Sequence, residues 1–540
     1  MSEPTPAETA AEQPASAGSG GARAEAPTTS RIRGALSSPH LWVSSTYFAE
    51  GFPYTIVNNL ADILFKELGA SLQVIGLTSL FHLPWNLKFL WGPFVDGYET
   101  KRRWLVGTEI VLVALIVALA LLASVAGPGG NLMPLAAGFL VLAVLSATHD
   151  IAIDGYYLEA LDTDGQSRFV GYRAAAYRLA MLLVGGPIVT FCAWAGWTVG
   201  LLGCAGALGL MLAYHAFALP QVEDRKRPAT QLLRAVLKPR AAIALILAAA
   251  VFGLERWLGL GARMGGWLTD ARAAVDHRPV LSKIANLGVG AWVSIGLLVA
   301  LLAILAALPW LRRRLEAARE RGEVSDYAAS FVSFLDQRRV GVMLAFVMLF
   351  RTGESFLQKM RWPFLDDVVG LPLEVYGIMN GTAGVFASFL ATIIGGRLIA
   401  RDGLRKWIWP FILAQNLLNL LYMGVASLPD PTILAPGDDA SALAWLPLTA
   451  VVLAEHAGAG LGTAVFMVYI MRTCDPSHKA AHMAIVTALM SLGFTFAGVL
   501  SGFLAGAIGF SAYFGFTFAA TIPSMILIAF VPHLDGREGS

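Results

Sequence analysis

Charged side chains are scarce in this sequence. Only 14% of its 540 residues are Asp, Glu, Lys or Arg, whereas 56% are hydrophobic. Soluble domains carry about 25% charged residues, so the composition excludes an ordinary soluble enzyme. The net charge of +2 provides no basic surface for nucleic acid. The composition instead predicts a polytopic membrane protein that contacts the lipid bilayer.

Cysteine is also rare, and a signal peptide is missing. Cys192, Cys204 and Cys474 have neither metal-ligand spacing nor the even count of a disulfide framework. We therefore expect no metal site and no cofactor. Residues 1–34 are rich in small and polar side chains, which predicts a disordered cytoplasmic tail. They lack the basic-then-apolar order of a secretory signal.

Long apolar runs are abundant, and they fall into two sets of six. Runs of about 20 residues are long enough to cross a bilayer as helices. We expect an all-α fold with an N-terminal half at 35–222 and a C-terminal half at 334–540. The twelve expected core spans are 41–66, 72–93, 104–126, 132–158, 169–194, 197–219, 340–365, 373–400, 407–427, 445–471, 481–507 and 510–532.

The basic residues lie on one side of this arrangement. Clusters such as Lys101 to Arg103 and Arg225 to Arg227 fall between spans on that side, while the opposite loops are acidic. We expect the protein to lie in the inner membrane of the cell. The positive-inside rule then places both termini in the cytoplasm.

An insert at 223–333 separates the two halves. Its apolar runs at 241–261 and 286–309 predict two extra spans, which gives fourteen in total. Basic residues in the connecting segment leave an alternative, in which the two runs form an amphipathic pair at the cytoplasmic surface.

The two halves also share an internal repeat. Asp96 and Asp402 each precede a glycine and a basic cluster, and 53 residues separate Asp96 from His149 and Asp402 from Glu455. Such duplication is typical of transporters in which the substrate site lies between two halves near the bilayer midplane.

Polar side chains form a stripe along the first span. Glu50, Tyr54, Asn58 and Asp62 recur every four residues and so share one helix face. The stripe predicts a water-filled cavity, and the alternative is hydrogen bonding between helices without substrate contact.

Three ionisable residues interrupt the fourth span. Asp150 and Asp154 share a helix face, so both can be ionised only beside a cation, for which Arg173 and Arg178 are candidates. An Asp at a helix centre costs roughly 2.5 to 3.5 kcal/mol on insertion scales. We predict a proton-coupling site that includes His149 and Arg178, and a permanent ion pair is the alternative.

The seventh core span combines cations with one carboxylate. Arg351 and Glu354 are spaced to pair, and Gln358 follows on the same face. Lys359 and Arg361 either face the cavity, where they would suit an anionic substrate, or extend outward to the membrane surface.

The tenth core span carries a second carboxylate and imidazole. Glu455 and His456 lie near its middle with no local counter-charge, so we predict a protonatable cavity role for both.

Charged residues at two span ends predict a cytoplasmic gate. A carboxylate that pairs with basic residues across a short loop can stabilise one closed state. Lys88 is expected to extend to the cytoplasmic interface. The predicted gate residues are Asp96, Lys101, Arg102, Arg103, Asp402 and Arg405.

Several of these motifs resemble the peptide, acetyl-coenzyme A and drug transporters of the major facilitator superfamily, especially the AmpG-type muropeptide permeases. The motifs are Lys88-Phe89-Leu90-Trp91-Gly92-Pro93 with Asp96, Ser146 to Ile151 with Asp154, Tyr177-Arg178-Leu179, and Glu455 with Gly460-Leu461-Gly462-Thr463. The resemblance covers about 40–222 and 334–530. It implies the major facilitator fold and a helix-lined central cavity.

We therefore expect a proton-coupled transporter that works by alternating access, as a monomer, on a small-molecule substrate. The resemblance implies uptake of an anhydromuropeptide, with an acetyl-coenzyme A-like molecule, a siderophore or another anionic metabolite as alternatives. A membrane-embedded transferase with His149 as general base, or a substrate-sensing receptor, would be rivals of another class. The repeat argues against an enzyme, because an active site has no reason to recur in a second half.

Overall fold

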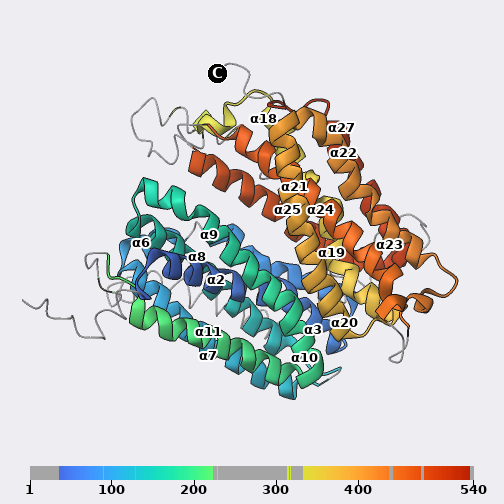
Figure 1. Ribbon diagram of the computed structural model, residues 1–540, viewed down its shortest axis with the longest axis horizontal. Coiled ribbons are helices and arrows are strands. Elements are labelled where there is room, and N and C mark those ends of the chain that lie inside the picture. The colour runs from blue at the N-terminus through green and yellow to red at the C-terminus, as the bar shows by residue number, and fades with distance from the viewer. Residues whose placement is uncertain are drawn as a thin grey trace, which may run out of the picture.

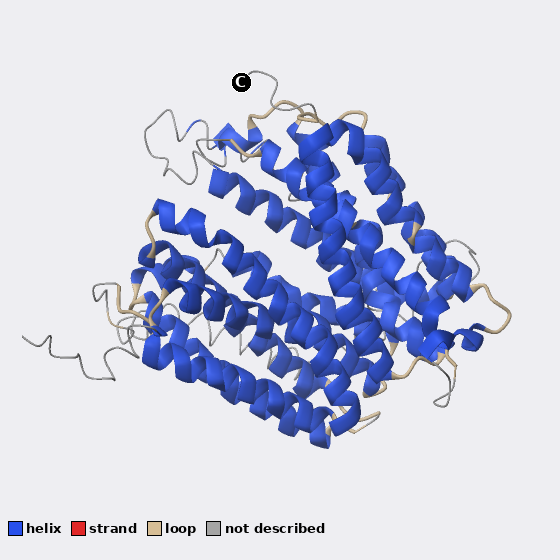
Figure 2. Ribbon diagram, in the orientation of Figure 1, coloured by secondary structure: helices blue, strands red, loops and turns tan. Residues whose placement is uncertain are grey.

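The computed structural model describes residues 36–88, 91–127, 129–222, 332–436, 442–475 and 479–534, with a few isolated residues between 223 and 331. These residues form helices and contain no strand (Figure 2). The expected all-α fold is confirmed. The tail at 1–34 and the apolar runs of the insert at 223–333 lie outside the described residues, so the total of fourteen spans stays a prediction.

The first helical bundle, called the N-terminal bundle, contains four long helical paths and two that consist of shorter pieces. Its elements are α2 (Pro39–Thr55), η1 (Ile56–Leu60), α3 (Ala61–Glu67), α4 (Leu72–Leu77), η2 (Thr78–His82), α5 (Leu83–Leu87), α6 (Gly92–Gly97), α7 (Lys101–Val125), α8 (Met133–Ala160), α9 (Thr163–Leu183), η4 (Val184–Ile188), α10 (Val189–Ala195) and α11 (Trp197–Ala218).

The second bundle, called the C-terminal bundle, follows the insert. Its elements are α18 (Val340–Phe350), α19 (Thr352–Phe364), η5 (Leu365–Val369), α20 (Leu373–Tyr376), η6 (Gly377–Gly384), α21 (Val385–Asp402), α22 (Leu404–Leu417), α23 (Asn419–Ala426), η7 (Pro431–Leu434), η8 (Ala442–Trp445), α24 (Leu446–Thr473), α25 (Lys479–Ile508), α26 (Phe510–Ala519) and α27 (Ile522–Leu527).

Ten helices in the described part of the chain are long and apolar enough to cross a membrane. They match ten of the twelve expected core spans. The other two expected spans, 41–66 and 72–93, are each built from shorter helical elements. The first consists of α2, η1 and α3, and the second contains α4, η2 and α5.

Prolines account for several of the interruptions. Pro53 precedes η1, Pro187 lies within η4, and Pro363 precedes η5. Proline lacks an N–H group and its ring clashes with the carbonyl one turn earlier, which widens the local turn. Wide π-helical turns are frequent at functional sites, and η1 and η6 carry the cavity residues Asn58 and Asn380.

The two bundles meet at one end of the molecule. Contacts between them join α4 to α25, η4 to η6, and α10 to α20. In Figure 1 the bundles come together where α3, α10 and α20 lie and diverge toward α6 and α18. We call the first of these the closed end and the other the open end.

Glycines permit the contact between η4 and η6. A Cβ atom on Gly381 would overlap the carbonyl oxygen of Gly185, and one on Gly377 would press on Thr190. Glycine therefore lets the two backbones approach more closely than any other residue would. The closed end depends on this backbone contact.

Candidate functional site

A cavity of about 760 Å³ lies between the two bundles. Residues of α2, α8 and α9 line one wall, and residues of α19, η6, α21 and α24 line the other. Ten of the twelve predicted cavity residues are on these walls: Glu50, Asn58, Asp150, Asp154, Arg178, Arg351, Glu354, Gln358, Glu455 and His456. The lining does not include Tyr54 or His149.

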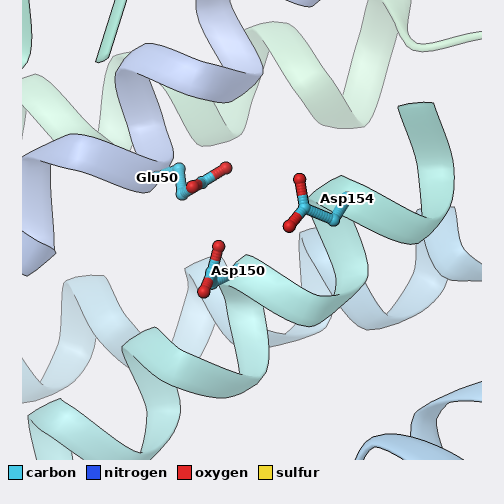
Figure 3. Close-up of side chains that lie close together, drawn as sticks. All are labelled: Glu50, Asp150 and Asp154. Carbon is cyan, nitrogen blue, oxygen red and sulfur yellow. The ribbon is translucent and has the colours of Figure 1, made fainter. Parts of the chain in front are cut away.

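Three carboxylates converge on the N-terminal wall. Glu50 of α2 points toward Asp150 and Asp154 of α8 (Figure 3), and one oxygen of each lies within 4.8 Å of the others. Two cations contact the pair on α8: Lys88 binds Asp150, and the Arg173 guanidinium lies 2.8 Å from Asp154 Oδ1. Glu50 Oε2 is buried without a hydrogen-bond partner. These neighbouring cations already neutralise two of the three carboxylates, which disfavours a divalent metal ion here.

The structure corrects the expectation for Lys88 and shows which of the two candidate arginines pairs with the aspartates of α8. Lys88 does not extend to the membrane interface, because its ammonium group binds Asp150 inside the cavity. Arg173 is the partner of Asp154, as predicted, and the phenol of Tyr47 donates to the same oxygen over 2.9 Å. Arg178 contacts neither Asp150 nor Asp154. Its guanidinium lies over the ring of Phe389, 5.8 Å from the centroid.

On the opposite wall, Arg351 and Glu354 form the predicted pair. The Arg351 guanidinium donates from Nε over 3.0 Å and from Nη2 over 2.5 Å to the two carboxylate oxygens. The side-chain amides of Gln358 and Gln415 also donate to Glu354, over 2.9 and 3.3 Å. Four N–H groups therefore hold the Glu354 carboxylate in place beside the cavity.

Glu455 has a counter-charge, contrary to the sequence expectation. The guanidinium of Arg361 donates to Glu455 Oε2 over 2.7 Å and to Asn380 Oδ1 over 2.7 Å. Arg361 is thus buried in the protein and does not extend outward. The partners lie 94 residues apart in the chain, on α19 and α24, so sequence spacing could not reveal the pair. This buried ion pair with Arg361 opposes the protonation that the sequence predicted for Glu455.

Lys359 joins the two bundles. Its ammonium group lies 2.7 Å from both oxygens of Asp62 and 2.7 Å from the hydroxyl of Thr78. The outward orientation considered for Lys359 is therefore wrong, and the polar stripe on the first span reaches across the cavity at Asp62. Lys66 extends this link at the closed end, 2.5 Å from Asp366 and 2.8 Å from Asp367.

The charges that line the cavity nearly cancel. Six cationic and six acidic side chains line it, and ten of these twelve form five ion pairs. The pairs are Lys88 with Asp150, Arg173 with Asp154, Arg351 with Glu354, Lys359 with Asp62, and Arg361 with Glu455. Within the described part of the chain, Glu50 and Arg178 have no ion-pair partner.

The structure also corrects the placement of His149. Its side chain is fully buried inside the N-terminal bundle, with Nε2 3.4 Å from Glu109 Oε1. The same oxygen lies 2.7 Å from Nδ1 of His215, whose Nε2 is 3.0 Å from the hydroxyl of Ser45. His149 and Asp150 are adjacent on α8 and therefore point about 100° apart. This explains why only Asp150 reaches the cavity.

Replacement of Glu109 by alanine should destabilise the protein. The change leaves two buried imidazoles without their shared carboxylate, and an unsatisfied buried polar group costs about 1 to 3 kcal/mol. We expect a lower melting temperature in detergent by scanning fluorimetry. The control is Glu374→Ala, because Glu374 is exposed and does not line the cavity. Equal melting temperatures for the two variants would contradict the assignment.

The predicted gate residues make contacts inside their own bundles. Lys101 binds Asp96 and Arg103 binds Glu99, with 2.8 Å between the latter pair. Arg102 donates to the carbonyls of Ala216 and Leu219 at the end of α11. Asp402 accepts from Arg401, Lys406 and Trp407, and Arg405 is exposed on α22. The bundles are apart at this end, and the gate role stays a prediction.

Comparisons with known proteins agree on a transporter. No protein-family model matches the sequence. The anhydromuropeptide permease of Escherichia coli K12 is 23% identical over 89% of this chain and 77% of its own length. An uncharacterised protein of Haemophilus influenzae is 23% identical over 91% of this chain and 93% of its own length.

Solved structures share the fold at low sequence identity. A peptide transporter of the POT type, in complex with sulfate, superposes with a TM-score of 0.56 over 92% of this chain and 94% of its own, at 16% identity. The nucleoside transporter NupG gives a TM-score of 0.52 over 91% of this chain and 99% of its own, at 10% identity. The homologues are permeases, so the chain is a transporter and not an enzyme. It is a multi-pass membrane protein that shares the fold of these solved transporters, and its named homologues are permeases of the AmpG type.

Proposed function

We propose that the protein is a proton-coupled symporter that takes up an anhydromuropeptide across the inner membrane into the cytoplasm. The observation that carries the coupling is Glu50, a buried cavity carboxylate without an ion-pair partner beside Asp150 and Asp154. Leaving such a group ionised in an apolar bundle is costly, so it neutralises by taking up a proton. The muropeptide comes from the name of the Escherichia coli relative.

The orientation of the protein in the membrane rests on the shape of the molecule and on its charges. The closed end carries the acidic loop residues Asp366 and Asp367, and the open end carries the basic clusters near Lys101 and Arg401. The positive-inside rule assigns the open end to the cytoplasm. The structure then corresponds to a state in which the cavity releases its substrate inward, and both termini are cytoplasmic.

Rocking of the two bundles would expose the cavity alternately to the two sides. For the outer side to open, Lys359 must leave Asp62, Lys66 must leave the two aspartates of η5, and η4 must separate from η6. The gate residues at the open end would pair across the bundles when that end closes. We propose that one copy of the chain suffices, because the cavity is complete within it.

Uptake by purified protein in liposomes tests this function. We expect a labelled anhydromuropeptide to accumulate when the outside is made acidic, because a pH gradient equivalent to about 100 mV releases about 2.3 kcal/mol per proton, enough for roughly 50-fold accumulation. Unlabelled acetyl-coenzyme A and a siderophore serve as competitors. Uptake that ignored the proton gradient would contradict the coupling. If unlabelled acetyl-coenzyme A or the siderophore reduced uptake and unlabelled muropeptide did not, the proposal that a muropeptide is the substrate would be contradicted.

A further inference from the structure

Arg178 differs from every other cation on the cavity walls. The other five each contact a carboxylate, whereas Arg178 has no acidic partner in the described part of the chain. Its side chain extends from α9 of the N-terminal bundle to the ring of Phe389 on α21 of the C-terminal bundle. The guanidinium therefore lies in the space between the two bundles, exposed to the cavity.

A second guanidinium faces the same space. Arg351, which immediately precedes α19, uses Nε and Nη2 to bind Glu354, and no hydrogen bond from its Nη1 occurs among the described residues. Its side chain remains 28% exposed, so these donors stay accessible from the cavity. Arg178 and Arg351 line the same cavity from opposite bundles. Two guanidinium groups from opposite bundles thus face one cavity, and among the described residues only Arg351 of the two has a carboxylate partner.

The unpaired carboxylate of the cavity does not fill this position. Glu50 lies within the cluster that contains Asp150 and Asp154, and its nearest cations belong to that cluster. Glu354 is fully engaged by Arg351 and two amide groups. Among the described residues, no acidic side chain is therefore paired with Arg178.

We propose that an anionic group of the substrate, a carboxylate or a phosphate, binds between Arg178 and Arg351. The planar guanidinium offers paired N–H donors that match two oxygens of such a group. This inference rests on the proposed function for the identity of the transported molecule, but the anion site follows from the two arginines alone. A carboxylate is the form that a muropeptide would supply through its peptide, or that the peptide-free sugar would supply through its lactyl group.

The position of this site has a consequence for transport. Arg178 belongs to the N-terminal bundle and Arg351 to the C-terminal bundle, so a bound anion bridges the two. In the absence of substrate, closure of the open end would bury the unpaired guanidinium of Arg178 beside that of Arg351, which is costly. A bound anion attracts the guanidinium groups of both Arg178 and Arg351, which favours closure of the open end once the cavity is loaded.

A matched pair of ligands tests the site. The first is 1,6-anhydro-N-acetylmuramic acid, which carries one carboxylate, and the second is its neutral methyl ester. We expect the full-length protein in detergent to bind the acid at least tenfold more tightly than the ester. In Arg178→Gln the preference should vanish, because only the acid loses a partner, and Arg178→Lys should retain part of it. The control is Arg397→Gln, since Arg397 is exposed on α21 outside the cavity lining.

The outcomes separate this inference from the proposed function. A tenfold preference that persists in Arg178→Gln, or equal binding of acid and ester by the unaltered protein, would overturn the anion site. If the unaltered protein binds neither ligand, the sugar alone is not recognised, and the anion site is then tested with inorganic sulfate. Sulfate should raise the melting temperature of the unaltered protein above that in chloride at equal ionic strength. The same rise in Arg178→Gln would refute the site.

Discussion

Transport should fall below detection when Gly381 is replaced by valine. A side chain at this position cannot coexist with the carbonyl of Gly185, so η4 and η6 cannot form their contact at the closed end. The variant should then occupy only states in which this end is open. Since alternating access needs both states, uptake of substrate into liposomes should be lost although the protein still folds.

A neighbouring glycine provides the control for this variant. A Cβ on Gly396 of α21 would meet no atom within 4 Å, so Gly396→Val should transport normally. Spin labels at positions 70 and 374, one on each bundle near the closed end, report the conformation. Gly381→Val should lengthen the distance between them relative to Gly396→Val. Normal uptake by Gly381→Val, or an unchanged distance, would contradict the role assigned to this contact.

Replacement of Glu50 by glutamine should abolish accumulation but not exchange. Glutamine imitates the protonated carboxyl group, so the variant can move its loaded cavity without taking up a proton. Under an imposed proton gradient the inside-to-outside ratio should fall from tens-fold to about one. Counterflow, in which labelled substrate exchanges for unlabelled substrate without a gradient, should continue.

A second glutamate controls for the chemical change. Glu374 is exposed on α20 and absent from the cavity lining, so Glu374→Gln should accumulate substrate normally. Accumulation by Glu50→Gln would place the coupling proton on another group. Loss of counterflow together with accumulation would mean that Glu50 is needed for substrate movement itself, contrary to the proposed role.

The sequence predicted the helical fold and most of the cavity, because both depend on patterns along one helix. Asp150 and Asp154 are one turn apart, and Arg351 and Glu354 are three residues apart, so a shared face could be read directly. The apolar runs gave the spans for the same reason. The 53-residue repeat then indicated that the polar positions of both halves face one cavity.

Pairs that join distant helices were missed. Lys359 and Asp62 are 297 residues apart, and Arg361 and Glu455 are 94 apart. No local pattern encodes such contacts, although three cations within one apolar span were a signal that carboxylates elsewhere must neutralise them. The repeat also misled the placement of His149. A common offset from Asp96 and Asp402 does not fix which of two adjacent residues faces the cavity, since neighbours on a helix point about 100° apart.

The movement of protons with the substrate tests the central claim most directly. Liposomes that contain the protein and a trapped pH indicator are held without a pH gradient and with the membrane potential clamped at zero. Addition of anhydromuropeptide outside should acidify the interior with the unaltered protein, and should leave the pH unchanged with Glu50→Gln although substrate still enters. Substrate uptake by the unaltered protein without any acidification would contradict proton coupling at Glu50.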